Sequence, residues 1–278
     1  MYPRLLHIYG PLWVQSYGVM IVLGFLLFLF LAYNDSRRAR LIDSDTFFNV
    51  IFVGLVSAVV GGRLLFMITE WSSFSNPWLE MFCVWKGGFV VLGSIIGVIT
   101  AVPIYLKMHS VKVLRFLDIV ALYGPLMQSV ARIGCLLAGC CYGAQVHGFI
   151  FSIVFNDTVG LAPTGVALHP TQIYMSLLSL SIFVILLTLK RSLQKPGQTI
   201  FLYLVFESIA RIGVDFWRGD RGDVINIFCL PFDFSLSLMQ LWSTAFLFLS
   251  LIPIFYSLFL LYQVMKLDFE KLCLQFHF

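Results

Sequence analysis

The sequence contains little charge. Only 12% of its 278 residues are charged, whereas 60% are hydrophobic, and the mean hydropathy is +0.93. Soluble globular domains carry about 25% charged residues, so this composition excludes an ordinary soluble protein and indicates a polytopic membrane protein. The net charge of +4 is modest and gives no reason to expect a nucleic-acid partner.

The amino-terminal region has no features of a cleavable signal peptide. The first apolar run is too long for the hydrophobic region of such a peptide, and no small-residue cleavage site precedes the next run. We therefore expect the first span to stay in the membrane.

The cysteines lack a recognisable metal-binding pattern. Three of the six follow one another as Cys-x4-Cys-Cys, at Cys135, Cys140 and Cys141, without paired CxxC units or nearby His ligands. We expect these residues to behave as buried small hydrophobes, in preference to a metal site or a disulfide. The spacing therefore gives no reason to expect a metal at these cysteines.

Long apolar windows recur along the chain. A helix needs about 20 apolar residues to cross the hydrocarbon core, whereas barrel strands alternate over about 10 residues, so the windows favour helices. We predict an all-α polytopic membrane protein with a single integral membrane domain over residues 1–278. About seven spans are expected, at residues 14–33, 47–68, 87–106, 116–137, 171–189, 199–216 and 235–262.

The basic residues predict an orientation. Eleven Lys and Arg residues lie in the loops after the first, third and fifth spans and in the carboxyl-terminal tail, whereas only four lie in the remaining loops and amino-terminal segment. By the positive-inside rule, the amino terminus is outside and the carboxyl terminus is cytoplasmic. The outer loop over residues 144–168 has no Lys or Arg and contains the strand-like stretch 149–155, so we expect a small extracytoplasmic hairpin or cap.

Three arginines remain, one toward the outer end of each even-numbered span: Arg63, Arg132 and Arg211. An arginine at the centre of a membrane helix costs roughly 2.5 to 3.5 kcal/mol on insertion scales, so each requires a partner or a function. Three guanidiniums at one depth favour an anionic ligand such as a phosphate or a carboxylate. The alternative is that each arginine snorkels to the interface or pairs with an acidic residue, namely Asp118, Glu207 or Asp215.

Glycines accompany these arginines. Gly61 and Gly62 precede Arg63, and Gly93 and Gly97 are four residues apart in the third span. Small residues at such positions allow helix backbones to approach closely, and they also allow a lipid head group to reach backbone amides. Close helix packing is the more common reason for such glycines.

Taken together, these motifs resemble the prolipoprotein diacylglyceryl transferase family over most of the chain. The elements are Ser16-Tyr17-Gly18, Gly61-Gly62-Arg63, Trp85-Lys-Gly-Gly88, Gly93-Ser-Ile-Ile-Gly97, the run from Arg132 to Gly143, His169-Pro-Thr-Gln-Ile-Tyr174, Glu207-Ser-Ile-Ala-Arg211, Asp215-Phe-Trp-Arg218 and Ser237-Leu-Met-Gln240. Each motif alone is weak, but their order and spacing together are specific.

The resemblance implies a multi-pass enzyme of the bacterial inner membrane. Such an enzyme transfers diacylglyceryl from phosphatidylglycerol to the lipobox cysteine of a preprolipoprotein and releases glycerol phosphate, without a cofactor. It implies catalytic roles for Arg132 and Arg211, which would bind the phosphate and stabilise the leaving group. The resemblance further implies substrate binding by Arg63, Arg218, Tyr17, Gln172 and Gln240.

The chain departs from the family pattern at several positions. Leu92 stands where the family often has His, Met175 stands in place of a Glu, and Glu207 stands in place of a Tyr. The run from Gly134 to Cys140 replaces a segment that is usually rich in Asn. Because the usual His is a candidate general base, its absence leaves the acceptor of the thiol proton open.

Three routes for that proton remain. His169 is the catalytic candidate, although a His at this place also serves as a helix-start residue packed before Pro170. Glu207 is another candidate, but its four-residue spacing from Arg211 also favours an ion pair. A thiol, whose ordinary pKa is about 8.5, would also ionise more readily beside several guanidiniums.

Two other function classes fit parts of the sequence. The departures at Leu92 and Met175 are compatible with a noncatalytic relative that binds anionic phospholipid or a lipoprotein precursor. A transporter for an organic anion would explain three buried arginines but not the ordered series of motifs.

Overall fold

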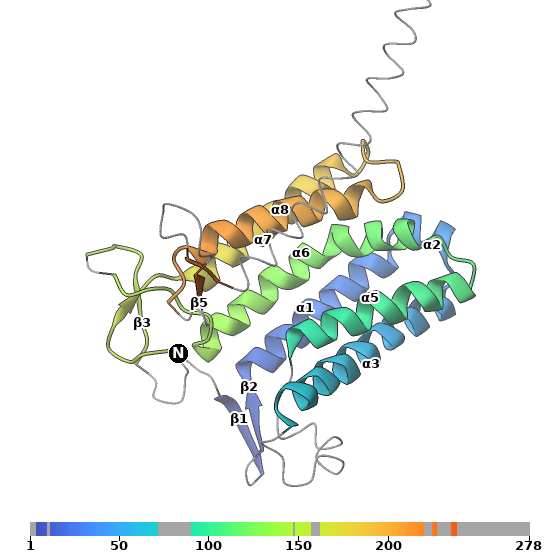
Figure 1. The fold of residues 1–278 in the computed structure, drawn as a ribbon. Helices are drawn as coiled ribbons and strands as arrows, with labels where there is room; N and C mark the ends of the chain where they lie inside the picture. The colour runs from blue at the N-terminus through green and yellow to red at the C-terminus, as the bar shows by residue number, and fades with distance from the viewer. Residues whose placement is uncertain are drawn as a thin grey trace, which may run out of the picture. The chain divides into compact units, whose positions relative to one another are not determined.

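The computed structural model describes residues 4–9, 12–71, 90–146, 148–156, 162–219, 224–226 and 235–237. Seven helices lie in these ranges: α1 (Ser16–Tyr33), α2 (Ser36–Leu41), α3 (Ser44–Thr69), α5 (Val91–Met108), α6 (Val113–Ala138), α7 (Thr171–Leu189) and α8 (Gln198–Asp215) (Figure 1). Three antiparallel strand pairs accompany them: β1 (Arg4–Tyr9) with β2 (Leu12–Gln15), β3 (Ile153–Val154) with β4 (Ala167–Leu168), and β5 (Val224–Asn226) with β6 (Ser235–Ser237).

Five of the helices in the described residues are long and apolar enough to cross a membrane, namely α1, α3, α5, α6 and α7. They coincide with the first five predicted spans, and side chains such as Phe30 and Phe52 are exposed on them, as helices surrounded by lipid require. The chain is therefore an all-α, multi-pass membrane protein. Helix α8 overlaps the sixth predicted span, but it carries three charged residues, Glu207, Arg211 and Asp215.

The predicted starts of the first and last spans were wrong. Val14 and Gln15 belong to β2, and Ser235–Ser237 form β6, so both apolar windows included strand residues. The cause is that an apolar window does not separate a short strand from the first turn of a helix. The rest of the seventh predicted span, including Gln240, lies outside the described residues.

One compact unit comprises residues 32–119, with α2, α3, α5 and the first turns of α6. Two of its helices, α2 and α3, are capped by aspartates: Asp35 accepts a hydrogen bond from the Arg37 amide at 2.8 Å, and Asp43 accepts one from the Thr46 amide at 2.9 Å. Phe47 and Phe116 are buried with ring centroids 6.4 Å apart, and they form part of the core of this unit.

Helices α3 and α5 pack backbone against backbone at three glycines. A β-carbon on Gly61 would collide with the carbonyl oxygen of Gly93, one on Gly93 would collide with that of Gly61, and one on Gly97 would collide with that of Ser57. The sequence prediction of close helix packing is confirmed for this pair. The two helices lie side by side in Figure 1.

We expect Gly61→Ala to destabilise the protein. The new methyl group has no space, so the helices must separate, and overpacking of this kind costs about 1 to 3 kcal/mol. The matched control is Gly54→Ala in the same helix, where the nearest side-chain atom, Cγ2 of Val102, would lie 3.6 Å from the new β-carbon. Thermal unfolding in detergent should show a lower Tm for Gly61→Ala than for Gly54→Ala. Equal Tm values would contradict a rigid contact at Gly61.

The second compact unit comprises residues 1–31 and 120–278. It contains most of α1 and α6, together with α7 and α8, which pack side by side (Figure 1). Leu122, Met175, Leu186 and Val214 are buried in this unit. The assignment of residues 1–278 to a single membrane domain stays a prediction.

The predicted strand-like stretch 149–155 is strand in only part of its length. Ile153 and Val154 pair with β4, and Phe155 bridges to Thr164. Phe155, Ala162 and Leu168 form a small buried cluster that stabilises this segment. An antiparallel strand pair therefore lies within residues 144–168. The cap, its extracytoplasmic position and the orientation of the chain stay predictions.

Candidate active site

Arg132 lies six residues before the end of α6 and is half-buried. Within the described part of the chain, its guanidinium makes no hydrogen bond and no ion pair. Its planar set of N–H donors is thus available to an external acceptor, and that geometry suits carboxylates and phosphates.

Two further guanidiniums share one carboxylate. Arg211 and Arg218 lie 3.7 Å and 3.8 Å from Oδ1 of Asp215, which is almost fully buried. The spacing in sequence explains the arrangement, because Arg211 lies one helical turn before Asp215 in α8, and Arg218 lies in the turn that follows the helix. Pairing with Asp215, which the sequence offered as a structural role for Arg211, is therefore present.

Arg132 belongs to the same charged group. The positive charge of Arg132 acts on both Arg211 and Glu207, and the positive charge of Arg218 also acts on Arg211. The described residues thus bring three guanidiniums together with two carboxylates, in a region bounded by α6 and α8. Guanidiniums gathered in this way are suited to bind an anionic ligand.

Glu207 does not pair with Arg211. Instead, Gln128 Nε2 donates to Glu207 Oε1 at 2.6 Å, and the Tyr203 hydroxyl donates to Gln128 Oε1 at 3.3 Å. Among the described residues, Glu207 and Arg211 form no ion pair, so that expectation from their spacing was wrong. The physical reason is that Asp215, also four residues from Arg211, is nearer to the guanidinium and takes its place.

The segment that follows α6 is fixed in position by the start of α7. Gly139 ends the helix with a positive φ of 70°, a conformation that glycine adopts easily. Thr171 Oγ1 then donates to the Cys141 carbonyl at 2.7 Å, and Gln172 Nε2 donates to the Cys140 carbonyl at 2.9 Å. The amide nitrogen of Gln172, a predicted substrate ligand, is thus hydrogen-bonded inside the protein.

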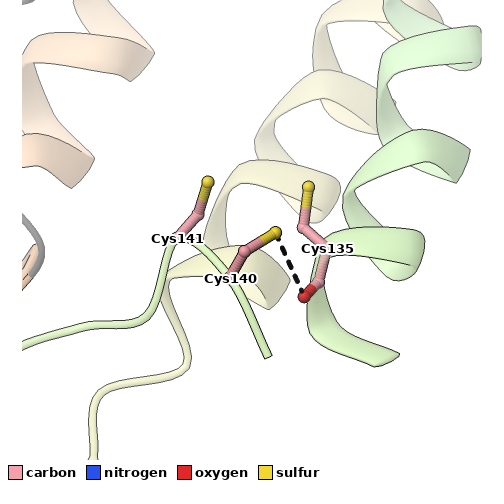
Figure 2. A group of neighbouring side chains, drawn as sticks. All are labelled: Cys135, Cys140 and Cys141. Atoms are coloured by element: carbon pink, nitrogen blue, oxygen red, sulfur yellow. Dashed lines mark hydrogen bonds between the residues drawn. The ribbon is translucent and has the colours of Figure 1, made fainter. Parts of the chain in front are cut away.

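The three thiols on this segment converge. The sulfur atoms of Cys135, Cys140 and Cys141 all lie within 4.8 Å of one another, as Figure 2 shows. Hydrogen bonds with the other two thiols, and then the charges of Arg132 and Arg218, lower the pKa of the Cys141 thiol, although burial opposes them. The spacing of these cysteines in the sequence alone did not predict that the three sulfur atoms would lie close together.

His169 lies at the end of the hairpin, immediately before α7. His169 lies so close to Gly143 that a β-carbon on Gly143 would collide with the carbonyl oxygen and the β-carbon of His169. The ring is half-buried against Phe149, with centroids 5.1 Å apart, and Nδ1 shares a hydrogen bond with the Tyr174 hydroxyl at 3.4 Å. His169 is therefore held among aromatic side chains.

The remaining predicted site residues lie in different places. Tyr17, in the first turn of α1, is exposed, and the charge of Arg132 acts on it. Gly134 allows α6 to approach α1 closely at this point. Arg63 is buried in the other compact unit, with its guanidinium 5.5 Å from the Phe66 ring centroid. The expectation that Arg63 lies at the same depth as Arg132 and Arg211 and binds the same anion stays a prediction.

Comparisons with known proteins agree with the motif series. The model of the prolipoprotein diacylglyceryl transferase family matches residues 3–256. A phosphatidylglycerol-prolipoprotein diacylglyceryl transferase of Clostridium tetani is 37% identical over 226 residues, which cover 81% of this chain and 88% of that protein. The Clostridium perfringens transferase 2 is 37% identical over 76% of this chain and 82% of its own length, and a Dehalococcoides mccartyi transferase is 31% identical over 75% and 79%. The chain therefore belongs to the prolipoprotein diacylglyceryl transferase family.

Proposed function

We propose that Arg132, Arg211 and Arg218 bind the phosphate of phosphatidylglycerol while this enzyme transfers its diacylglyceryl group to a prolipoprotein. The assignment of this activity rests on family membership, which extends over most of the chain. The observation that supports the phosphate site is the gathering of two guanidiniums, those of Arg211 and Arg218, at one buried carboxylate, with the charge of Arg132 acting on Arg211. Arg132, which has no protein partner among the described residues, adds a third set of donors.

The reaction requires stabilisation of a leaving phosphate. The thiol sulfur of the lipobox cysteine attacks the glycerol carbon that bears the phosphate ester, a carbon–sulfur bond forms, and the carbon–oxygen bond breaks. The electron pair of that bond leaves on the phosphate oxygen, and glycerol phosphate is released. Positioned guanidiniums stabilise the charge as it develops on this oxygen, and they hold the lipid for attack.

The thiol must lose its proton in the same reaction. We assign this proton to His169, which lies beside Gly143 at the end of the segment that follows α6. Glu207 is the alternative acceptor, because its Oε2 is buried and accepts no hydrogen bond within the described residues. Tyr17, Gln172, Arg63 and Gln240 keep their proposed roles as ligands of the head group or the ester carbonyls.

The two candidate acceptors can be distinguished by amide substitutions. We expect His169→Gln to lower the transfer rate by about 100-fold or more, the usual effect of losing a general base. Glu207→Gln preserves the shape of the Gln128 contact and should retain most of the rate. Rates at several pH values with a synthetic lipobox peptide would test both variants. A large loss in Glu207→Gln and none in His169→Gln would transfer the role to Glu207.

The function is tested by complementation in a bacterial strain depleted of its own transferase. We expect the wild-type chain to restore growth and to attach diacylglyceryl to a reporter lipoprotein, detected as a mass increase. The purified protein should catalyse the same transfer in micelles that contain phosphatidylglycerol, but not in micelles that contain only phosphatidylcholine. A stably inserted protein that fails in both assays would favour a noncatalytic lipid-binding relative.

The cellular site follows from the same proposal. Phosphatidylglycerol and the signal peptides of preprolipoproteins meet in the bacterial inner membrane, so the multi-pass chain is expected there. A reporter attached after Phe278 should be cytoplasmic, and one inserted near Asn156 should be extracytoplasmic.

A further inference from the structure

We infer that Cys135, Cys140 and Cys141 form a binding site for one thiophilic divalent metal ion of the Zn²⁺ class, with three thiolate ligands and an open fourth position. The three sulfur atoms lie within 4.8 Å of one another, and their side chains converge in Figure 2. All three cysteines are free of disulfide bonds. No His, Asp or Glu in the described part of the chain completes the set, so the fourth ligand would come from solvent or from a bound molecule.

The sulfur positions are close to those that a metal requires. Zinc–sulfur bonds are about 2.3 Å long, which places the sulfurs of a tetrahedral site about 3.8 Å apart. The sulfur atoms here are at most 4.8 Å apart. Small rotations about the Cα–Cβ bonds can bring them to the shorter distance. The main chain therefore does not have to move for an ion to bind.

The main chain that carries the thiols is already fixed. Cys135 lies in the last turn of α6, and the Cys140 amide donates to its carbonyl at 3.1 Å. Thr171 and Gln172 hold the carbonyls of Cys141 and Cys140 from the start of α7. Because the ligands are ordered before binding, an ion would not have to supply the free energy for ordering the segment.

The surrounding charge suits a metal thiolate. Three thiolates around a divalent ion carry one net negative charge, and the positive charges of Arg132 and Arg218 both act on Cys141. Thiolate ligands select soft ions such as Zn²⁺ over Mg²⁺ or Ca²⁺. Cys140 and Cys141 are only half-buried, which gives an ion a path to the sulfurs, whereas Cys135 lies at the buried end of the group.

The test uses the full chain with Cys83, Cys229 and Cys273 replaced by Ser, purified in detergent under reducing conditions. We expect Cd²⁺, as a spectroscopic substitute for Zn²⁺, to produce sulfur-to-metal charge-transfer absorption that saturates at one ion per chain. Zn²⁺ should displace it and protect all three thiols from alkylation. In this background, Cys140→Ser should weaken Cd²⁺ binding by more than about 100-fold, because changes to residues that only support metal ligands already cost about 10- to 100-fold.

Three results would overturn the inference. One is the absence of saturable absorption in the chain that retains all three cysteines. Another is unchanged absorption after Cys135, Cys140 and Cys141 are all replaced by Ser, which would place the ion elsewhere. The third is a single reactive thiol per chain in the reduced protein, which would show that a stable disulfide forms instead. None of these measurements depends on lipid transfer, so failure here leaves the proposed function untouched.

Discussion

Arg132→Ala is expected to lower the rate of diacylglyceryl transfer by about 100- to 1,000-fold, the usual effect of removing one donor to a developing anion. Among the described residues, no protein group accepts a hydrogen bond from the Arg132 guanidinium or forms an ion pair with it. Its loss should therefore remove a contact with substrate and leave the fold intact. The rate of transfer from phosphatidylglycerol to a lipobox peptide, followed by mass spectrometry, measures the effect. The Tm of the variant should stay close to that of the wild type.

Two controls sharpen this expectation. Arg132→Lys keeps the charge but loses the planar pair of donors, so an intermediate rate is expected. Arg115→Ala removes an exposed arginine near the other end of α6 and should transfer at the wild-type rate. If Arg132→Ala transfers as fast as Arg115→Ala, the assignment of Arg132 to the phosphate is wrong.

Asp215→Ala is expected to damage both stability and activity. Loss of one partner from a buried ion pair costs about 3 to 5 kcal/mol, and the value here should lie at the lower end, because the side chains of Arg211 and Arg218 are 15% and 14% exposed. The two guanidiniums would also repel each other and move. A displacement of about 1 Å from the productive geometry lowers a rate by about 100-fold. Thermal unfolding and the transfer assay measure the two effects separately.

Asp215→Asn separates charge from shape. It keeps the size of the side chain and removes only the negative charge, so a smaller loss of stability and a similar loss of rate are expected. Asp45→Asn, in the exposed first turn of α3, serves as the matched control and should change neither quantity. Wild-type rates in both Asp215 variants would show that the guanidiniums need no counter-ion for positioning.

Much of the helical framework could be predicted from the sequence, because apolar windows report the length that a bilayer requires. Helix α7 was placed at residues 171–189 without error, and α6 within three residues at each end. The errors at Val14 and Ser235 arose where a strand adjoins an apolar run. Periodicity does not distinguish these cases over two or three residues.

The side-chain partners were harder to predict. Arg211 had acidic residues four positions away on both sides, Glu207 and Asp215, and spacing alone does not choose between them. The choice depends on Gln128, which reaches Glu207 from another helix. Gln128 and Tyr203 were missed, although each is a polar residue four positions before a predicted site residue. That pattern was the available signal.

The contacts that fix the segment after α6 also bear on how this enzyme can diversify. Thr171 and Gln172 bind carbonyl oxygens of Cys140 and Cys141 and do not bind their side chains, so the path of the segment does not depend on which residues occupy these two positions. Mutation can therefore exchange thiols for other groups there while the neighbouring arginines keep their support. The sulfur chemistry of this segment can thus change without rebuilding the scaffold around it.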